Sequence, residues 1–316
     1  MTSSTAPSSP LVLLTGATGF VGTTVLPVLL DHGIRLRVLS RRAVDVPPKV
    51  DLHVVADADG IQLERALEGV QVVCHLAGRA HVTGRSRHQQ DDFDAVNVEA
   101  SCRLARTAFN SGTTRMVFVS SIGAVGSSSD PGQPLGESEK CQPTTPYGLS
   151  KRRAEQALRD EASEHHAELV VIRPPLVHGP GAPGNLALLS RLVSRGVPLP
   201  LAGVDNRRSL IHVRNLARIL SAAITLPAAA GQTFHVRDRD DYSTRQIVAA
   251  AARSAGRPAR MFRAPLAMVR AAAAITGRRA AYEQLTGWLQ VDDRKARKVL
   301  GVTPEDLPLE IGRAAG

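Results

Sequence analysis

The sequence has few cysteines, few aromatic residues and no long apolar run. Its three cysteines, Cys74, Cys102 and Cys141, show no CxxC spacing, so we expect no disulfide framework and no metal site, in a reducing, cytoplasmic compartment. Aromatic residues make up 3% of the chain and do not alternate with basic ones, so nucleic acid is not an expected partner. No apolar run approaches the roughly 18 residues of a membrane span, so we expect no integral membrane segment.

What the chain does contain is enough apolar sequence for a full core and an excess of basic charge. Of its 316 residues, 43% are hydrophobic and 22% are charged, which rules out a disordered chain. The formal net charge of +10 predicts an anionic partner such as a nucleotide. Residues 1–10 are rich in Ser, Thr and Pro, and we expect them to form a disordered tail.

Short apolar strands alternate with helices along the first half of the chain. We expect strands at 11–15, 36–39, 52–55, 70–75, 116–120, 169–172 and 233–236, and helices at 25–30, 63–67, 93–110 and 147–164. This alternation predicts an α/β fold with a Rossmann-type doubly wound parallel sheet, whose NAD(P)-binding domain covers 11–175. Residues 176–316, rich in Pro and Gly loops, are expected to form mostly a small C-terminal substrate-binding lobe with interleaved Rossmann elements.

A glycine-rich turn follows the first expected strand. Gly16, Gly19 and Gly22 have the spacing GxxGxxG, which lets the backbone turn tightly and approach a pyrophosphate at a helix N-terminus. The spacing alone is a weak signal, but here a strand precedes it and a helix follows it. The sequence therefore predicts a dinucleotide site, to which the intervening Thr18, Phe20 and Val21 also contribute.

The end of the second expected strand bears on the choice of nicotinamide cofactor. Ser40, Arg41 and Arg42 stand there, without the acidic side chain that would accept hydrogen bonds from the ribose hydroxyls of NAD. Two guanidinium groups and a hydroxyl suit a 2′-phosphate instead. We expect NADP(H) to be preferred, with NAD(H) as the alternative if the two arginines are merely exposed.

A tyrosine and a lysine one helical turn apart are the strongest catalytic signal. Tyr147 and Lys151 lie at positions i and i+4 of an expected helix and so share one face. A nearby ammonium group would lower the pKa of the phenol and make it a usable proton donor and acceptor. Ser121, at the end of the strand 116–120, is placed to hydrogen-bond a substrate carbonyl at the same sheet edge.

Seven stretches together resemble the extended short-chain dehydrogenase/reductases of the NAD(P)-dependent epimerase/dehydratase family. They are TGATGFVG (15–22), CHLAGRAHV (74–82), VNVEA (96–100), FVSSIGAVG (118–126), YGLSK (147–151), RPPLVHGPG (173–181) and RRSLIHVRNLA (207–217). The resemblance implies Ser121, Tyr147 and Lys151 as the catalytic set. It implies further cofactor contacts at Asp57, Leu76, Ala77, Gly78, Asn97, Arg173, Pro174 and Val177. It also implies a homodimer and a UDP-sugar substrate, which we expect to contact Ser121, His81, His178, Asn185 and Arg208.

Departures from the family pattern narrow the expected reaction. Ile122 and Gly123 stand where dehydratases of the family carry an Asp-Glu pair, and loss of water needs such an acid and base. The chain resembles most closely the 4-reductases of UDP-N-acetyl-6-deoxy-4-ketohexoses, of the quinovosamine or fucosamine type. We therefore predict NADPH-dependent reduction of a C4 keto group. The alternatives are an NAD-dependent UDP-glucose or UDP-GlcNAc 4-epimerase, a reductase of a hydrophobic ketone, and a non-catalytic NADP-binding protein.

The stretch 265–287 has two interpretations. It carries Arg270, Arg278 and Arg279 among alanines and leucines, a composition typical of segments that rest on an anionic membrane. Its apolar positions would equally serve to cover the substrate lobe. We expect the second.

Overall fold

The computed structural model describes residues 9–55, 60–80, 89–277 and 279–312. Most of the expected N-terminal tail lies outside these described residues, as do Asp57 and His81. Within the described ranges, no helix is long and apolar enough to cross a membrane.

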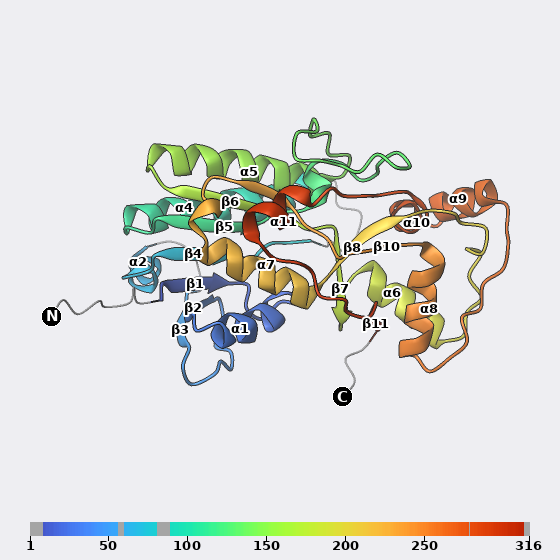
Figure 1. Ribbon diagram of the computed structural model, residues 1–316, viewed down its shortest axis with the longest axis horizontal. Helices are drawn as coiled ribbons and strands as arrows, with labels where there is room; N and C mark the ends of the chain where they lie inside the picture. Colours follow the sequence, from blue (N-terminus) through green and yellow to red (C-terminus); the bar gives the residue numbers. More distant parts are fainter. Residues whose placement is uncertain (1–8, 56–59, 81–88, 278, 313–316) are drawn as a thin grey trace.

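Seven parallel strands form the main sheet, in the order β3-β2-β1-β4-β5-β6-β9 (Figure 1). The strands are β1 (Leu11–Thr15), β2 (Arg35–Ser40), β3 (Asp51–Val54), β4 (Val72–His75), β5 (Arg115–Val119), β6 (Glu168–Arg173) and β9 (Thr233–His235). The order reverses between β1 and β4, and ligands of doubly wound sheets bind beyond the carboxyl ends of the strands at such a reversal. The predicted fold class is confirmed.

Helices cover both faces of this sheet. On one face pack α1 (Gly22–Asp31), α7 (Val213–Thr225) and α11 (Arg294–Leu300), and on the other α2 (Ile61–Leu67), α4 (Ala100–Asn110) and α5 (Pro146–Glu164). In β1, Val12 and Leu14 face the first layer and Leu13 faces the second, all without solvent exposure. Burial on both faces explains why this strand is apolar without alternation.

The expected continuous helix over 93–110 is interrupted. It consists of α3 (Gln89–Asp94), a π-helical turn η1 (Ala95–Glu99) and α4. The π-helical turn changes the helical register, and Asn97 within it is fully buried. A wider turn at this point therefore brings a polar side chain toward the sheet edge.

After β6 the chain forms a smaller lobe with a second sheet. Its four-stranded sheet has the order β10-β8-β7-β11, with β7 (Leu176–Pro180), β8 (Arg208–His212), β10 (Asp241–Tyr242) and β11 (Ile311–Gly312). The helices α6 (Asn185–Ser194) and α8 (Thr244–Ser254) pack on it around one apolar cluster, and α9 (Leu266–Ile275) and α10 (Arg279–Thr286) lie at its outer end (Figure 1). The chain also returns to the main sheet through α7, β9 and α11. The domain boundary at 175/176 stays a prediction.

Candidate active site

The glycine turn after β1 forms a cradle that side chains would fill. Gly16 has φ +73°, and a Cβ there would lie 2.7 Å from the backbone nitrogen of Ala77. A Cβ on Gly22 would lie 2.1 Å from the carbonyl oxygen of Gly16, and the Gly19 amide donates to that oxygen at 3.0 Å. The turn opens directly into α1, whose N-terminus has no side-chain cap, and the Thr23 amide donates back to the Gly19 carbonyl at 3.0 Å. These features fit a dinucleotide pyrophosphate.

A buried hydrogen-bond chain fixes the ends of β1 and β4 beside this cradle. The Thr15 hydroxyl lies 2.7 Å from Nδ1 of His75 and accepts from the Ala77 amide, and Nε2 of His75 lies 2.9 Å from the Ser101 hydroxyl. The Leu76 amide donates to the Thr15 carbonyl. Burial lowers the pKa of His75 to about 3, so the imidazole is neutral and has a positioning role.

Asn97 clamps the segment that follows β4. Its Oδ1 accepts from the Arg79 amide at 2.8 Å, and its Nδ2 donates to the Arg79 carbonyl and to the Ser150 hydroxyl. A Cβ on Gly78 would lie 3.1 Å from Asn97 Oδ1 and 3.2 Å from Nζ of Lys151. The absence of a side chain at Gly78 therefore lets this segment pass close to Lys151.

Helix α5 brings Tyr147 next to Ser121. Thr145 caps the helix by accepting from the Gly148 amide at 3.0 Å, and a Cβ on Gly148 would lie 2.2 Å from the carbonyl oxygen of Gly123. This close approach seats the first turn of α5 on the short 3₁₀ turn η2 (Ile122–Ala124). The Ser121 side chain interacts with the Tyr147 phenol and opposes the rise of its pKa, and Ser121 Oγ accepts from the Gly123 amide at 3.0 Å.

The electrostatics of the tyrosine and lysine differ from the expectation. The Lys151 ammonium donates to the Val119 carbonyl at 2.9 Å and lies 4.6 Å from the ring centroid of Phe118. Burial raises the pKa of Tyr147 to about 12, against the opposing hydrogen bond from Ser121, and burial lowers the pKa of Lys151 to about 8. The predicted lowering of the phenol's pKa by Lys151 is not found, because burial is the dominant effect on this group and Lys151 is not among the groups that shift it. Tyr147 is a protonated phenol at neutral pH and suits a proton donor.

A buried ion pair joins α5 to the end of β6. Nε of Arg173 donates to Glu155 Oε1 at 2.8 Å and Nη2 donates to Oε2 at 2.5 Å, and the Ser120 hydroxyl donates to Oε1 at 2.6 Å. Burial by itself would raise the pKa of Glu155, but the hydrogen bonds and charge of Arg173 lower it. The Arg173 guanidinium, expected at the cofactor, is thus engaged with a carboxylate of α5. Glu155 was not among the expected site residues, although it stands four residues after Lys151 on the same helix face.

The other expected cofactor residues lie along the same sheet edge. Thr18 is exposed in the glycine turn, whereas Phe20 and Val21 are half-buried against the lobe cluster and the main core. The Pro174 carbonyl accepts from the Ile122 amide at 2.9 Å. Val177 is paired with β8.

Two exposed arginines mark the carboxyl end of β2. Arg41 and Arg42 directly follow the strand, and the Ser40 hydroxyl accepts from the Arg42 amide at 3.3 Å. Neither guanidinium has a hydrogen-bond or ion-pair partner among the residues that the structure describes. Within the described residues, both guanidinium groups are therefore free to bind a ligand.

In the lobe, Arg208 is a buried cation without a carboxylate partner in the described ranges. Its Nη1 donates to the Gly287 carbonyl at 2.8 Å, whereas its Nε has no partner there. The residue is 4% exposed, and burial lowers its pKa to about 10. An unpaired buried guanidinium is costly and favours an anionic ligand. Asn185, at the start of α6, donates to Gln284 of α10.

His178 does not lie where a substrate contact was expected. Its imidazole is fully buried, with Nε2 2.8 Å from Asp238 and the ring centroid 5.0 Å from that of His212. The Asp238 carboxylate also accepts from the His212 amide and from Asn215. We correct the expectation for His178: its side chain is enclosed between β7 and its neighbours, because its strand is interior to the second sheet.

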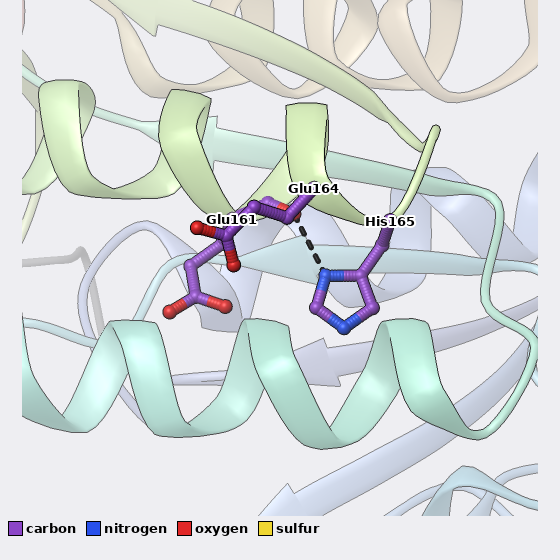
Figure 2. Close-up of side chains that lie close together, drawn as sticks. All are labelled: Glu161, Glu164 and His165. Atoms are coloured by element: carbon purple, nitrogen blue, oxygen red, sulfur yellow. Dashed lines mark hydrogen bonds between the residues drawn. The ribbon is translucent and has the colours of Figure 1, made fainter.

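One group of possible metal ligands occurs on α5 and its C-terminus. Ligand atoms of Glu161, Glu164 and His165 lie within 4.8 Å of one another (Figure 2). Nδ1 of His165 is hydrogen-bonded to the Glu161 carbonyl and Nε2 to Asn110, and the Glu161 carboxylate is paired with Arg106. Because the ligand atoms of His165 and Glu161 are already engaged, we propose no metal site on this cluster.

Known proteins resemble this chain in sequence and in fold. The model of the NAD dependent epimerase/dehydratase family matches residues 12–236. A UDP-glucose 4-epimerase of Vibrio cholerae is 35% identical over 296 residues, covering 93% of this chain and 90% of its own length. A ceramide reductase of Caulobacter vibrioides is 30% identical over 309 residues, covering 96% of this chain and 88% of its own. The solved UDP-glucose 4-epimerase of Thermotoga maritima with UDP-glucose has a TM-score of 0.74 at 21% identity, with 93% and 94% of the two chains covered. The chain therefore belongs to the NAD dependent epimerase/dehydratase family and is an enzyme of the extended short-chain dehydrogenase/reductase type.

Proposed function

We propose that this enzyme reduces the C4 keto group of a UDP-sugar with NADPH. The observation that carries the proposal is the pair of exposed guanidinium groups at Arg41 and Arg42, where a ribose-binding acid would otherwise stand. A reductase exchanges its cofactor in every turnover and draws on the NADPH pool, whereas an epimerase returns the hydride and retains its cofactor. A preference for a 2′-phosphate therefore favours net reduction.

The cofactor would be held along the edge already described. The cradle of Gly16 and Gly22 would receive the pyrophosphate, and the segment at Gly78, clamped by Asn97, would pass beside the nicotinamide end. When bound, the cofactor supplies a hydride to the substrate. Lys151, fixed on Val119, would donate to the nicotinamide ribose.

The chain's own groups would complete the reduction. Ser121 would hydrogen-bond the C4 oxygen, and Tyr147 would transfer its phenolic proton to that oxygen as the carbonyl becomes an alcohol. The raised pKa of Tyr147, about 12, supports this direction because the phenol carries its proton throughout the neutral range. Arg208 would meet the diphosphate and supply binding free energy away from the reacting carbon.

A UDP-hexose 4-epimerase is the second candidate. The Vibrio cholerae relative supports it, because that protein is 35% identical to this chain and the match covers at least 90% of each of the two. The same three side chains would serve, but the alcohol would first be oxidised and then reduced on the opposite face. The ceramide reductase relative supports a third candidate function, the reduction of a hydrophobic ketone. The buried charge of Arg208 weighs against it, since such a ketone offers no anion. A homodimer formed through α4 and α5 remains part of the proposal.

Cofactor content and consumption separate the two leading candidates. The purified protein is denatured and its released nucleotide identified, and fresh protein is mixed with NADPH and a UDP-4-keto-sugar. The proposal expects little retained nucleotide and one NADPH oxidised for each sugar reduced. Retained NAD, together with interconversion of UDP-hexoses without net NADPH loss, would establish the epimerase.

A further inference from the structure

Helix α9 presents an apolar stripe to solvent. Met268, Ala271, Ala272 and Ile275 follow the spacing i, i+3, i+4, i+7, which places them on one helix face, and all four are exposed. Met268 is 68% and Ile275 86% exposed, and α9 contains no buried residue. The expectation that the apolar positions of this stretch cover the substrate lobe is therefore wrong for these four side chains of α9, which are exposed, whereas Val269 and Ala273 are half-buried.

The sequence around α9 is strongly basic. Residues 242–282 contain eight arginines and no aspartate, glutamate or lysine, so they account for most of the formal net charge of +10. Arg253, in the last turn of α8, and Arg257, Arg260 and Arg263, between α8 and α9, are all exposed. An apolar stripe and a one-signed charge thus lie on the same end of the molecule.

A basic hollow adjoins the start of the helix. Leu266, the first residue of α9, borders a hollow of about 600 Å³, and so do Arg207, Arg245 and Arg263 against the single acid Asp205. Guanidinium groups bind phosphate oxygens in bidentate geometry. Sites for phosphate groups and for hydrocarbon therefore stand side by side.

We propose that α9 attaches the enzyme to the surface of an anionic phospholipid bilayer. The stripe of Met268, Ala271, Ala272 and Ile275 enters the boundary between headgroups and acyl chains, and the surrounding arginines bind the headgroup phosphates. Interfacial helices combine an apolar face with basic charge in this way. Because no described helix can cross a membrane, the attachment is at the surface.

Charge and composition favour a bilayer over other occupants. A second copy of this chain would place the exposed Arg253, Arg257, Arg260 and Arg263 against the same arginines, and their repulsion opposes a symmetric contact. A nucleic acid would pair with the arginines but would leave the exposed Met268 and Ile275 without an apolar partner. An anionic bilayer offers acyl chains to the apolar stripe and phosphate groups to the arginines.

The position of α9 gives this attachment a direction. Figure 1 shows α9 at one end of the long axis and α2 at the other, with α10 beside α9. Gln284 of α10 accepts from Asn185, and the Tyr282 hydroxyl donates to the Leu266 carbonyl of α9. The docked helix would therefore hold the substrate lobe next to the membrane and the β2 end of the sheet away from it.

Vesicle co-sedimentation of the full chain tests the proposal. We expect binding to vesicles containing phosphatidylglycerol, at least about tenfold weaker binding to phosphatidylcholine alone, and a loss of binding when salt screens the charges. The variant Met268→Ser/Ile275→Ser should weaken binding at least about tenfold, since it removes the two largest inserted side chains. Equal binding to both vesicle types, or no binding to either, would overturn the proposal.

A matched control separates the stripe from exposed apolar residues in general. Ile61, at the start of α2, is 66% exposed, so Ile61→Ser removes a comparable side chain at the opposite end of the molecule without changing the charge. Ile61→Ser should bind anionic vesicles as the unaltered chain does. Circular dichroism should show unchanged folding in all variants. An Ile61→Ser loss equal to that of the α9 variant, or a chain that self-associates through α9 in sedimentation, would contradict the bilayer as the occupant.

Discussion

The Lys151 ammonium donates to the carbonyl oxygen of Val119 over 2.9 Å, which ties the second turn of α5 to the end of β5. Lys151 is thereby fixed one helical turn from Tyr147 without lowering the pKa of the phenol, which burial raises to about 12. Burial also brings the pKa of the lysine down to about 8, close to the working range. At neutral pH the site therefore holds Tyr147 as a protonated phenol, as the proposed role of proton donor requires.

Removing the proposed proton donor should abolish turnover without affecting the fold. Tyr147→Phe should lower kcat by about 10²- to 10⁴-fold, the usual range for a lost general acid, while dinucleotide affinity stays within about twofold. Steady-state kinetics and fluorescence titration with NADPH measure the two effects. Tyr282→Phe removes a hydroxyl from α10 and should retain activity within about twofold. Full turnover by Tyr147→Phe would refute the role of the phenol.

The buried lysine should make stability depend on alkaline pH. Between pH 8 and 10 the unfolded chain binds a proton at Lys151 that the folded chain has released, so the free energy of unfolding rises with pH. The rise is about 2 kcal/mol relative to Lys151→Met. The buried Cys74 thiol, whose pKa is raised to about 12, titrates equally in both proteins and cancels in the difference.

Urea denaturation of both proteins at pH 8, 9 and 10 measures this difference. Above pH 10 the raised pKa of Tyr147 lowers the rise with pH in each protein, because the unfolded tyrosine loses a proton that the folded one keeps, and this contribution also cancels in the difference. A difference that stays constant from pH 8 to 10 would show that Lys151 is not desolvated as described.

Breaking the buried ion pair between Glu155 of α5 and Arg173 of β6 should be strongly destabilising. Glu155→Gln leaves the Arg173 guanidinium, 3% exposed, without its counter-charge, and we expect a loss of about 3–5 kcal/mol in the free energy of unfolding. Glu164→Gln makes the same chemical change on the exposed face of α5 and should cost less than about 0.5 kcal/mol. Equal effects of the two substitutions in chemical denaturation would contradict the structural role of the pair.

The glycine cradle should tolerate no side chain at Gly22. Gly22→Ala would place a methyl group 2.1 Å from the Gly16 carbonyl oxygen, so we expect dinucleotide affinity to fall at least about tenfold, with loss of stability. Gly136→Ala is the control, because its Cβ would meet nothing closer than 4.0 Å. Titration with NADPH and with NADH checks both. Unchanged affinity in Gly22→Ala would place the cofactor elsewhere.

The two exposed arginines should set the cofactor preference. Arg41→Ala/Arg42→Ala should raise KM for NADPH by about 10- to 100-fold and leave KM for NADH nearly unchanged, because charge-assisted hydrogen bonds to the 2′-phosphate are lost. Arg35→Ala, at the opposite end of β2, is the control and should have no effect on either cofactor. Equal use of both cofactors before and after the substitution would remove the basis for NADPH.

The main sheet could be predicted because its strands have one simple pattern. β1 carries consecutive apolar residues, buried on both faces, and lies where it was expected. β7 and β8 gave no such signal. β8 is buried along its whole length yet contains Arg208, Ser209 and His212. Ser209 and His212 are held by tertiary hydrogen bonds and Arg208 by one bond to Gly287, and these polar residues hide the strand in the sequence.

The candidate site was predictable where spacing within one element carries the chemistry. Tyr147 and Lys151 share a helix face, so their proximity follows from the sequence alone. The partner of Glu155 lies on another element, and nothing local indicates that Arg173 turns toward α5 instead of the cofactor. The pKa of Tyr147 depends on how much water the folded chain excludes, which the residue types do not reveal.

The most direct test of the reductase assignment is the stoichiometry of cofactor oxidation. The purified enzyme is mixed with NADPH and a limiting amount of a UDP-4-keto-sugar, and the absorbance of the reduced nicotinamide is followed together with the sugar product. We predict one NADPH oxidised for each C4 alcohol formed. Conversion of UDP-sugars with no net oxidation of NADPH would contradict the account.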